Sequence, residues 1–168
     1  TANTLNLTNS GSITGTTTYG VLAGTGATIV NNAGGVISAP AIALWIQNGA
    51  NITNFGSITG TAAFGAAILA GSGVSITNGG TISGITAIQF SSAQAGHNTL
   101  TLLPGSVISG NVRGSNLGND VLQLGGTGTA SFDVSQIGAG AQYRGFGTFN
   151  KIDSSVWTEP AVASPSAR

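Results

Sequence analysis

Polar and apolar positions follow a repeating phrase along the first two thirds of the chain. The phrase reads "LTNSGSITG" at Leu7 to Gly15, "ITNFGSITG" at Ile52 to Gly60 and "ITNGGTISG" at Ile76 to Gly84. Looser copies, "VNNAGGVISA" and "LLPGSVISG", begin at Val30 and Leu102. The copies place Ile13, Ile37, Ile58, Ile82 and Ile108 at successive steps of 24, 21, 24 and 26 residues. A repeat of this length is typical of a stacked, solenoid architecture.

The residue types within each unit indicate which solenoid the repeat builds. Leucine-rich, ankyrin and tetratricopeptide repeats need a leucine lattice or strong helix formers, which these units lack. Short apolar runs bounded by Asn and Gly predict strands joined by turns instead. We therefore expect an all-β chain: a right-handed, single-stranded parallel β-helix of about seven coils, which at the spacing of sheet strands makes a rod about 34 Å long.

Each phrase has a turn portion and a strand portion. Asn and Gly tolerate the left-handed backbone that turns require. Stacked amides can also hydrogen-bond to one another along the axis. The sequence predicts such an Asn ladder at the turns, formed by Asn9, Asn32, Asn54 and Asn78. In the strand that follows, alternation turns each Ile of the repeat inward and its Ser or Thr neighbours outward.

A second strand in each coil carries two neighbouring apolar columns. Alignment on the following glycine gives one column of Leu22, Trp45, Leu69 and Phe90, and another of Val21, Leu44, Ile68 and Gln89. Neighbouring columns face opposite sides of a sheet. Because Gln89 marks the outward side, we expect Trp45 inside, beside Ala43, and an exposed stripe of Val21, Leu44 and Ile68. Such a stripe is a candidate partner-facing surface, unless a preceding segment of a longer protein covers it.

Charged residues are confined to the last third of the chain. The acids are Asp120, Asp133, Asp153 and Glu159, and the bases are Arg113, Arg144, Lys151 and Arg168. General acid–base catalysis and Ca²⁺ binding need clustered oxygen or titratable groups, and nucleic-acid binding needs Lys and Arg. We therefore expect a chain that is not an enzyme, has no cofactor or metal site, and does not bind nucleic acid.

Other candidate chemistry in the sequence is sparse. His97, in "AGHNTL", has no acidic or Cys neighbour and is interpreted as a solvated loop residue, while "GTGAT" and "GGTGTG" lack the following GK[ST] of a phosphate loop. Cysteine is absent, so no disulfide or thiolate site is expected. No apolar run reaches the roughly 18 residues of a membrane span. The start at Thr1, without a leader, suggests a mature or excised fragment.

The C-terminal third resembles the end of a bacterial autotransporter passenger domain, exported by type V secretion. In that family a phrase of the form F-x-x-F-x-K-x-x-x-S-x-W-T closes the β-helix, and here it reads "FGTFNKIDSSVWT" from Phe146 to Thr158. The upstream N-x-G-x-I-x-G coils also suit such passengers. We accordingly divide the chain into β-helix coils (1–135), a C-terminal cap (136–158) and a flexible tail (159–168), "EPAVASPSAR" in its final ten residues.

The resemblance implies a cellular location and a role for the cap. Passengers of this family cross the periplasm and outer membrane of a Gram-negative bacterium, fold outside, and are secreted or displayed on the cell surface; the parent protein would continue into an outer-membrane β-barrel. The family's autochaperone region maps onto the aromatic segment here. Cap or folding-seed residues would be Tyr143, Phe146, Phe149, Lys151 and Trp157.

Three classes of function fit these patterns. The leading hypothesis is a non-catalytic passenger associated with virulence: a stalk, adhesin or binding module for a host-cell receptor, extracellular matrix or a sibling passenger. The alternative is an ice-binding or self-associating solenoid, because Ser12/Thr14, Ser57/Thr59 and Thr81/Ser83 resemble an outward hydroxyl ladder that Val36 interrupts. A polysaccharide-cleaving β-helix enzyme is the least favoured, since the coils lack charged residues.

Overall fold

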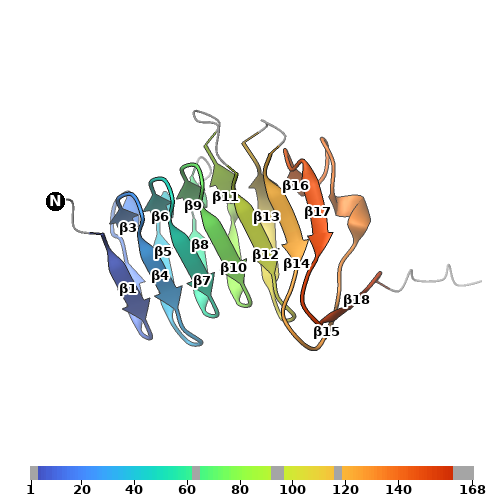
Figure 1. The fold of residues 1–168 in the computed structure, drawn as a ribbon. Helices are drawn as coiled ribbons and strands as arrows, with labels where there is room; N and C mark the ends of the chain where they lie inside the picture. Colours follow the sequence, from blue (N-terminus) through green and yellow to red (C-terminus); the bar gives the residue numbers. More distant parts are fainter. Residues whose placement is uncertain (1–3, 62–64, 92–96, 116–118, 161–168) are drawn as a thin grey trace, which may run out of the picture.

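The chain folds into one parallel β-solenoid (Figure 1). The computed structural model describes residues 4–61, 65–91, 97–115 and 119–160. Within these ranges the regular elements are strands, apart from a single 3-10 turn, η1 (Val134–Gln136). The scarcity of Lys, Glu and Arg, which build helix surfaces, and the many Thr, Ile and Val residues account for this preference.

One face of the rod is a seven-stranded parallel sheet. In spatial order its strands are β1 (Asn6–Asn9), β4 (Thr28–Asn31), β7 (Asn51–Asn54), β10 (Ser75–Asn78), β12 (Thr99–Leu102), β14 (Val121–Leu124) and β17 (Thr148–Lys151). Each strand comes from one coil, so these strands mark the successive rungs of the solenoid. The predicted parallel β-helix is therefore confirmed.

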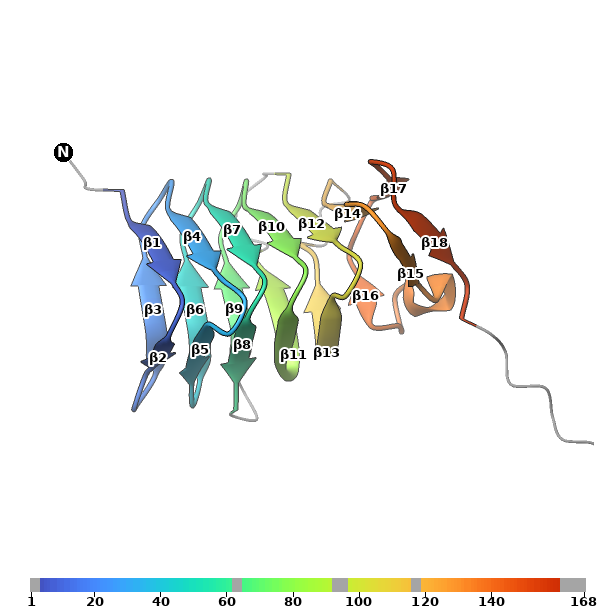
Figure 2. The same cartoon turned by 90° about the horizontal axis from the view of Figure 1, so that it is seen from below.

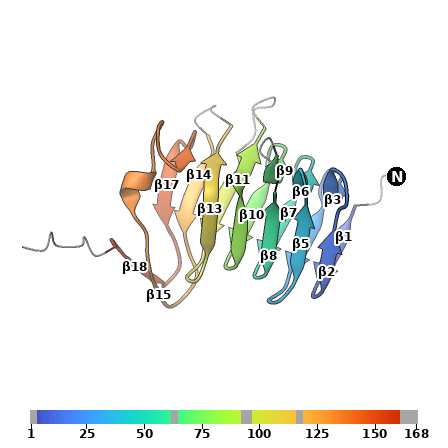
Figure 3. The ribbon, with the colours of Figure 1, turned by 180° about the vertical axis from the view of Figure 1, so that it is seen from behind.

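The second sheet wraps around the rest of each coil (Figures 2 and 3). One part contains β2 (Ser12–Thr14), β5 (Val36–Ala39) and β8 (Ser57–Gly60), and the other contains β3 (Tyr19–Ala23), β6 (Ile42–Ile46) and β9 (Ala66–Ala70). The longer strand β11 (Thr81–Phe90) pairs with both parts and with β13 (Val107–Arg113), which in turn pairs with β16 (Tyr143–Arg144). A separate two-stranded sheet joins β15 (Thr129–Ser131) to β18 (Val156–Thr158).

The core consists of columns of aliphatic side chains in register. Ile13, Ile37, Ile58, Ile82 and Ile108 pair successively through β2, β5, β8, β11 and β13, as the repeat predicts. Ile37, Ile58 and Ile82 are completely buried. Burying such a side chain contributes about 1.5–3 kcal/mol, so each coil is stabilised mainly by contact with its neighbours.

The predicted cap is partly a further rung of the rod. Its strands β16 and β17 continue the two large sheets in register, while β18 pairs with β15 in the separate small sheet. Phe149 follows Leu122, and Tyr143 follows Val112. The cap therefore places aromatic side chains where the preceding coil has aliphatic ones, and of the two only Tyr143 is buried. Of the predicted flexible tail, Glu159 and Pro160 are exposed, and 161–168 lie outside the described residues.

Candidate functional site

The predicted partner-facing stripe is wrong, because its residues point into the core. Leu44 and Ile68 are fully buried, and Val21 is half-buried against them. The register pairs Val21 with Leu44 and Leu44 with Ile68, but Ile68 pairs with Ile88 rather than with Gln89. The alignment on glycine therefore slipped by one residue at β11, and a slip of one residue exchanges the two faces of a strand.

The outward column on these strands is formed by Leu22, Trp45 and Leu69. Register continues this column to Gln89, which is outward as predicted, and then to Arg113. Leu22 is 58% exposed, while Trp45 and Leu69 are half-buried, so Trp45 does not lie inside as expected. We call Leu22, Trp45 and Leu69 the apolar column.

An aromatic pair, the exposed Tyr19 and the half-buried Trp45, forms part of this surface. Tyr19 lies on β3 beside the apolar column, and its ring centroid is 5.0 Å from that of Trp45 at an interplanar angle of 42°. A pocket of about 310 Å³ opens next to Trp45 and Leu69, and its other lining residues include Gln47 and Asn48. The combination of one aromatic side chain, apolar side chains and a few amide groups is typical of small-ligand and interface surfaces.

The Asn ladder exists, with one correction. The Nδ2 group of Asn9 donates to Oδ1 of Asn31 at 2.8 Å, that of Asn31 to Asn54 at 2.8 Å, and that of Asn54 to Asn78 at 2.7 Å. Asn31 thus occupies the rung predicted for Asn32, whose side chain donates instead to the Ser10 hydroxyl at the surface. We call the four buried residues, Asn9, Asn31, Asn54 and Asn78, the amide ladder.

Glycine permits the close stacking beside the amide ladder. A Cβ on Gly56 would overlap the carbonyl oxygen of Gly35, and one on Gly80 would overlap that of Gly56. The same ladder amides also donate to turn carbonyls, for example from Asn78 to Gly80 at 2.9 Å. The repeated N-x-G pattern therefore satisfies the buried turn carbonyls while leaving space for the adjacent coil.

Hydroxyl groups line the outer side of β2, β5, β8 and β11, as predicted. Thr14, Ser38, Thr59, Ser83 and Ser109 form one unbroken file in register. The neighbouring file is interrupted by Val36 and by Val107, which are 37% and 53% exposed. Several hydroxyls lie within hydrogen-bond distance of each other, as Thr14 and Ser38 do at 3.3 Å.

Aromatic side chains gather at the C-terminal end of the described rod. Phe132 packs against Tyr143 and Phe149, with ring centroids 5.4 and 5.6 Å apart, and Phe146 meets Phe90 edge-on at 6.3 Å. Tyr143 is buried, whereas Phe149 remains 41% exposed. The aromatic residues predicted for the cap therefore do gather at one end of the core.

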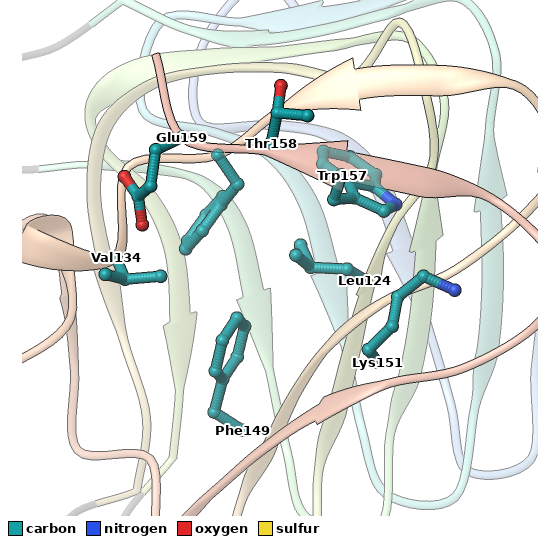
Figure 4. A pocket seen from close by; sticks show the side chains of 8 residues that line it. Leu124, Val134, Phe149, Lys151, Trp157, Thr158 and Glu159 are labelled. Atoms are coloured by element: carbon teal, nitrogen blue, oxygen red, sulfur yellow. The ribbon is translucent and has the colours of Figure 1, made fainter. Parts of the chain in front are cut away.

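A shallow pocket of about 250 Å³ lies in this aromatic end (Figure 4). Leu124 lies between the rings of Phe149 and Trp157, and the Lys151 ammonium group points away from the centre of the pocket. Lys151 Nζ donates to the carbonyl oxygens of Ile152 at 2.6 Å and Asp153 at 2.8 Å. Lys151 thus closes its own turn rather than presenting a charge to a ligand in this pocket.

A buried polar contact near β14 is a feature that sequence reasoning missed. The Asp120 carboxylate accepts hydrogen bonds from the backbone and side-chain N–H groups of Asn98 and from the Ser115 backbone. Asn98 also accepts from the backbone of Val74 at 3.0 Å, so it links three coils. His97 is exposed and contacts the Asn119 carbonyl oxygen at 3.1 Å. The only sequence signal was the isolated polar residues in "HNT" and "GND".

Two titratable groups of the C-terminal end have shifted pKa values. Burial raises the pKa of the Tyr143 hydroxyl to about 12. Hydrogen bonds from the Ser135 side chain, the Gln136 side chain and the Ser135 backbone lower the pKa of the exposed Asp133, which precedes η1. Both shifts move the pKa away from neutral pH, where the pKa of a general acid or base is most effective.

No protein family model matches the chain, and neither a curated protein nor a solved structure matches it. The described residues therefore carry the functional argument.

Within 4–61, 65–91, 97–115 and 119–160, no three His, Cys, Asp or Glu residues come together as metal ligands. In the same ranges no helix has the length and hydropathy that would carry it across a bilayer. The apolar column with Tyr19 gathers exposed and half-buried apolar side chains on one face of the rod.

Proposed function

We propose that this chain is a non-catalytic binding rod of the autotransporter-passenger type, secreted or displayed on the surface of a Gram-negative bacterium. The observation that carries the proposal is the apolar column: Leu22, Trp45 and Leu69, with Tyr19 beside them, on a rigid and nearly charge-free solenoid. Exposed aromatic and aliphatic groups gathered on one face commonly mark a contact surface.

Rigidity of the rod supports a binding role. Each coil pairs with its neighbours through parallel strands on two faces, so the apolar column is held in a fixed register. A preorganised surface loses little conformational entropy when a partner docks. The partner we propose is a host-cell receptor, a matrix protein or a sibling passenger that meets the surface with apolar groups.

The closing phrase supports the passenger assignment. The residues that resemble the family's cap, including Phe146, Phe149 and Trp157, lie on the last rung and its loops, next to the end of the core. A cap at this end suits a chain that crosses the membranes unfolded and then stacks its coils outside. Export through the periplasm and outer membrane remains part of the proposal.

The test is adhesion of beads coated with the purified chain to cultured epithelial cells and to immobilised matrix proteins. Trp45→Ser together with Leu69→Ser should reduce adhesion at least tenfold, because both substitutions remove the centre of the apolar column. Phe55→Ser is the matched control, since Phe55 is a 47% exposed aromatic residue outside this column. Equal adhesion by the double variant and the wild type would refute the assignment of this surface.

Ice binding is a second candidate because one hydroxyl file, from Thr14 to Ser109, is unbroken in register over five coils. A regular hydroxyl array can match a lattice, but the adjacent file is broken at Val36 and Val107. Thermal hysteresis measured on the wild type and on Thr59→Val separates the two candidates. Hysteresis that the substitution removes would favour ice binding, and no hysteresis would leave the binding rod.

A further inference from the structure

The outward column changes its chemistry at the C-terminal end of the rod. Register carries it from Leu69 to Gln89, then to Arg113 and finally to Arg144. The residues before the two arginines, Val112 and Tyr143, are buried, so alternation turns both arginine side chains outward. Arg113 and Arg144, which we call the arginine pair, therefore extend from the same face on adjacent rungs.

Two like charges directly opposite each other in a sheet destabilise it. Adjacent parallel strands lie about 4.8 Å apart, so the arginine pair concentrates two positive charges at one place. Among the residues that the structure describes, no carboxylate forms an ion pair with either guanidinium, and neither guanidinium has a side-chain hydrogen bond. Within the described residues, therefore, no ion pair offsets this repulsion.

Two acidic residues between Arg113 and Arg144 in the sequence, Asp120 and Asp133, already accept hydrogen bonds from other groups. Asp120 is completely buried, and both of its carboxylate oxygens accept hydrogen bonds, from Asn98 and from the Ser115 backbone. Asp133 likewise accepts hydrogen bonds from Ser135 and Gln136 around η1. These carboxylates are used locally, which leaves the arginine pair available to an external anion.

We propose that the arginine pair is a binding site for an oxyanion: a carboxylate, sulfate or phosphate group that bridges the two guanidiniums. Guanidinium groups bind oxyanions through paired, charge-assisted N–H donors. A bridging anion also removes the repulsion between the two arginines. Neither the apolar column nor the proposed adhesive role requires this site.

A neighbouring pocket indicates how a larger ligand would fit. The pocket measures about 390 Å³ and is lined by Arg144 together with Ile137, Tyr143 and Phe146. An oxyanion carried on an organic body, such as a sulfated sugar, could place its anionic group at the arginine pair and its remaining atoms against these apolar walls. Free inorganic sulfate would engage the arginine pair alone.

The first experiment follows the arginine side chains directly. Nitrogen-15-labelled full chain is titrated with inorganic sulfate and, separately, with a sulfated oligosaccharide, while the Nε–H resonances of arginine are recorded by NMR. We expect two of the three arginine signals to shift saturably and together. Tighter binding of the oligosaccharide would identify a sugar-borne oxyanion, and equal binding would identify the anionic group itself as the ligand.

Substitutions then locate the site. Arg113→Gln and Arg144→Gln should each weaken oxyanion binding at least tenfold, and Arg113→Lys should weaken it less, because lysine keeps the charge but loses the paired donors. Arg168→Gln is the matched control, since it removes the same charge from the C-terminal tail. Binding that falls equally in Arg168→Gln, or shifts that do not saturate at about 0.15 M ionic strength, would overturn the proposal in favour of diffuse attraction.

Thermal melting provides an independent test, because the difference in melting temperature between Arg113→Gln and the wild type should change when sulfate is added. In buffer without oxyanions, Arg113→Gln should melt at the same or a higher temperature than the wild type, because it removes a like-charge contact. At millimolar sulfate the wild type should gain more in melting temperature than Arg113→Gln or Arg144→Gln. An equal gain in all variants would mean that sulfate acts only through general exclusion from the surface, and would also overturn the site.

Discussion

The first four coils and the two that follow fill the same buried corner with different side chains. The corner holds Asn9, Asn31, Asn54 and Asn78 in the first four coils and then Leu102 and Leu124, and the exposed Lys151 ends this register. An amide at this position needs partners on both adjacent rungs, whereas a leucine needs only contact. The amide ladder coils are therefore mutually dependent, while the later coils tolerate the varied chemistry of the C-terminal end.

The two regions also differ in charge and aromatic content. The amide ladder coils contain no charged residue, and their core is aliphatic apart from Phe90 at the end of β11. The last coils contain the arginine pair, the buried Asp120 and the aromatic cluster around Phe132. The repeated, uncharged amide ladder coils therefore form the length of the rod, and the less regular coils that follow form its C-terminal end.

The largest expected effect comes from a charge inside the regular coils. Ile58→Asp places a carboxylate at a completely buried position, and the cost of several kcal/mol should unfold the adjacent coils. Circular dichroism should show β structure with almost no helix for the wild type and loss of that signal in the variant. Ser57→Asp, one residue away on the outer face, is the control. A variant that melts like the wild type would mean that Ile58 faces water.

Truncation of the aromatic end should come next. Replacing a buried Trp by Ala typically costs roughly 3–5 kcal/mol, and Trp157 is half-buried, so we expect about 3 kcal/mol for Trp157→Ala. Its indole Nε1 also donates to the Ser155 hydroxyl at 2.9 Å. If this end seeds folding, the variant should also refold more slowly after denaturant dilution.

Ile13→Ala provides the comparison at the opposite end, since Ile13 is also partly buried against the core. It should lower stability and leave the refolding rate nearly unchanged. Equal slowing by both substitutions would remove the argument for a C-terminal seed and leave Trp157 as a plain cap residue.

An interruption of the amide ladder should cost slightly less. Asn54→Ala removes two ladder hydrogen bonds and the bonds from Asn54 to the Gly56 and Thr81 carbonyl oxygens, and it leaves the buried Oδ1 of Asn78 without its ladder donor. Such orphaned groups cost about 1–3 kcal/mol each, so we expect a total of about 2–3 kcal/mol by urea unfolding. Asn32→Ala, which removes only a surface contact with Ser10, should change stability by less than about 0.5 kcal/mol.

High pH should weaken the C-terminal end by the smallest amount. Burial raises the pKa of Tyr143 from its ordinary value of 10.0 to about 12, so the folded chain holds this proton more tightly than the unfolded chain. The stabilisation is complete below pH 10 and is lost as pH rises towards about 12. We expect a loss of about 2 kcal/mol, measured by denaturation across this range.

Tyr143→Phe serves as the control for the pH effect, because it keeps the ring contact with Phe132 and removes the ionisable group. The part of the pH dependence that belongs to Tyr143 should disappear in this variant. An unchanged profile would assign the loss of stability to other groups.

Sequence periodicity predicted the fold because each Ile of the repeat is both inward and in register. It failed where two adjacent residues compete for one position. The "VNN" segment offers Asn31 and Asn32, and only the geometry of the preceding strand selects Asn31 for the ladder. The interpretation of the outer face failed similarly: Phe90 pairs with Ala70, not with Leu69, so the slip of one residue placed Trp45 on the wrong side.

The cap and the arginine pair show what local patterns cannot reveal. The aromatic residues could be assigned to one end from their spacing, but the partners Phe90 and Phe132 come from earlier coils. Arg113 and Arg144 are 31 positions apart in sequence, and only the pairing of β13 with β16 brings them onto adjacent rungs. The coils differ in length, so contacts between them can be predicted only when the pairing register of their strands is known. Composition does not give this register.

The amide ladder has a direction as well as a length. Every Nδ2 group donates towards the higher-numbered coil, so the four amide dipoles are aligned and polarise one another. An Asn side chain placed one coil before Asn9 could donate to Asn9 Oδ1, which already accepts one hydrogen bond from the Gly11 backbone. At the other end, the register places the apolar side chain of Leu102 next to Asn78, so the ladder has no further acceptor there. The amide ladder is therefore polar along the rod. A further Asn rung would extend it at the Asn9 end, whereas Leu102 ends it after Asn78.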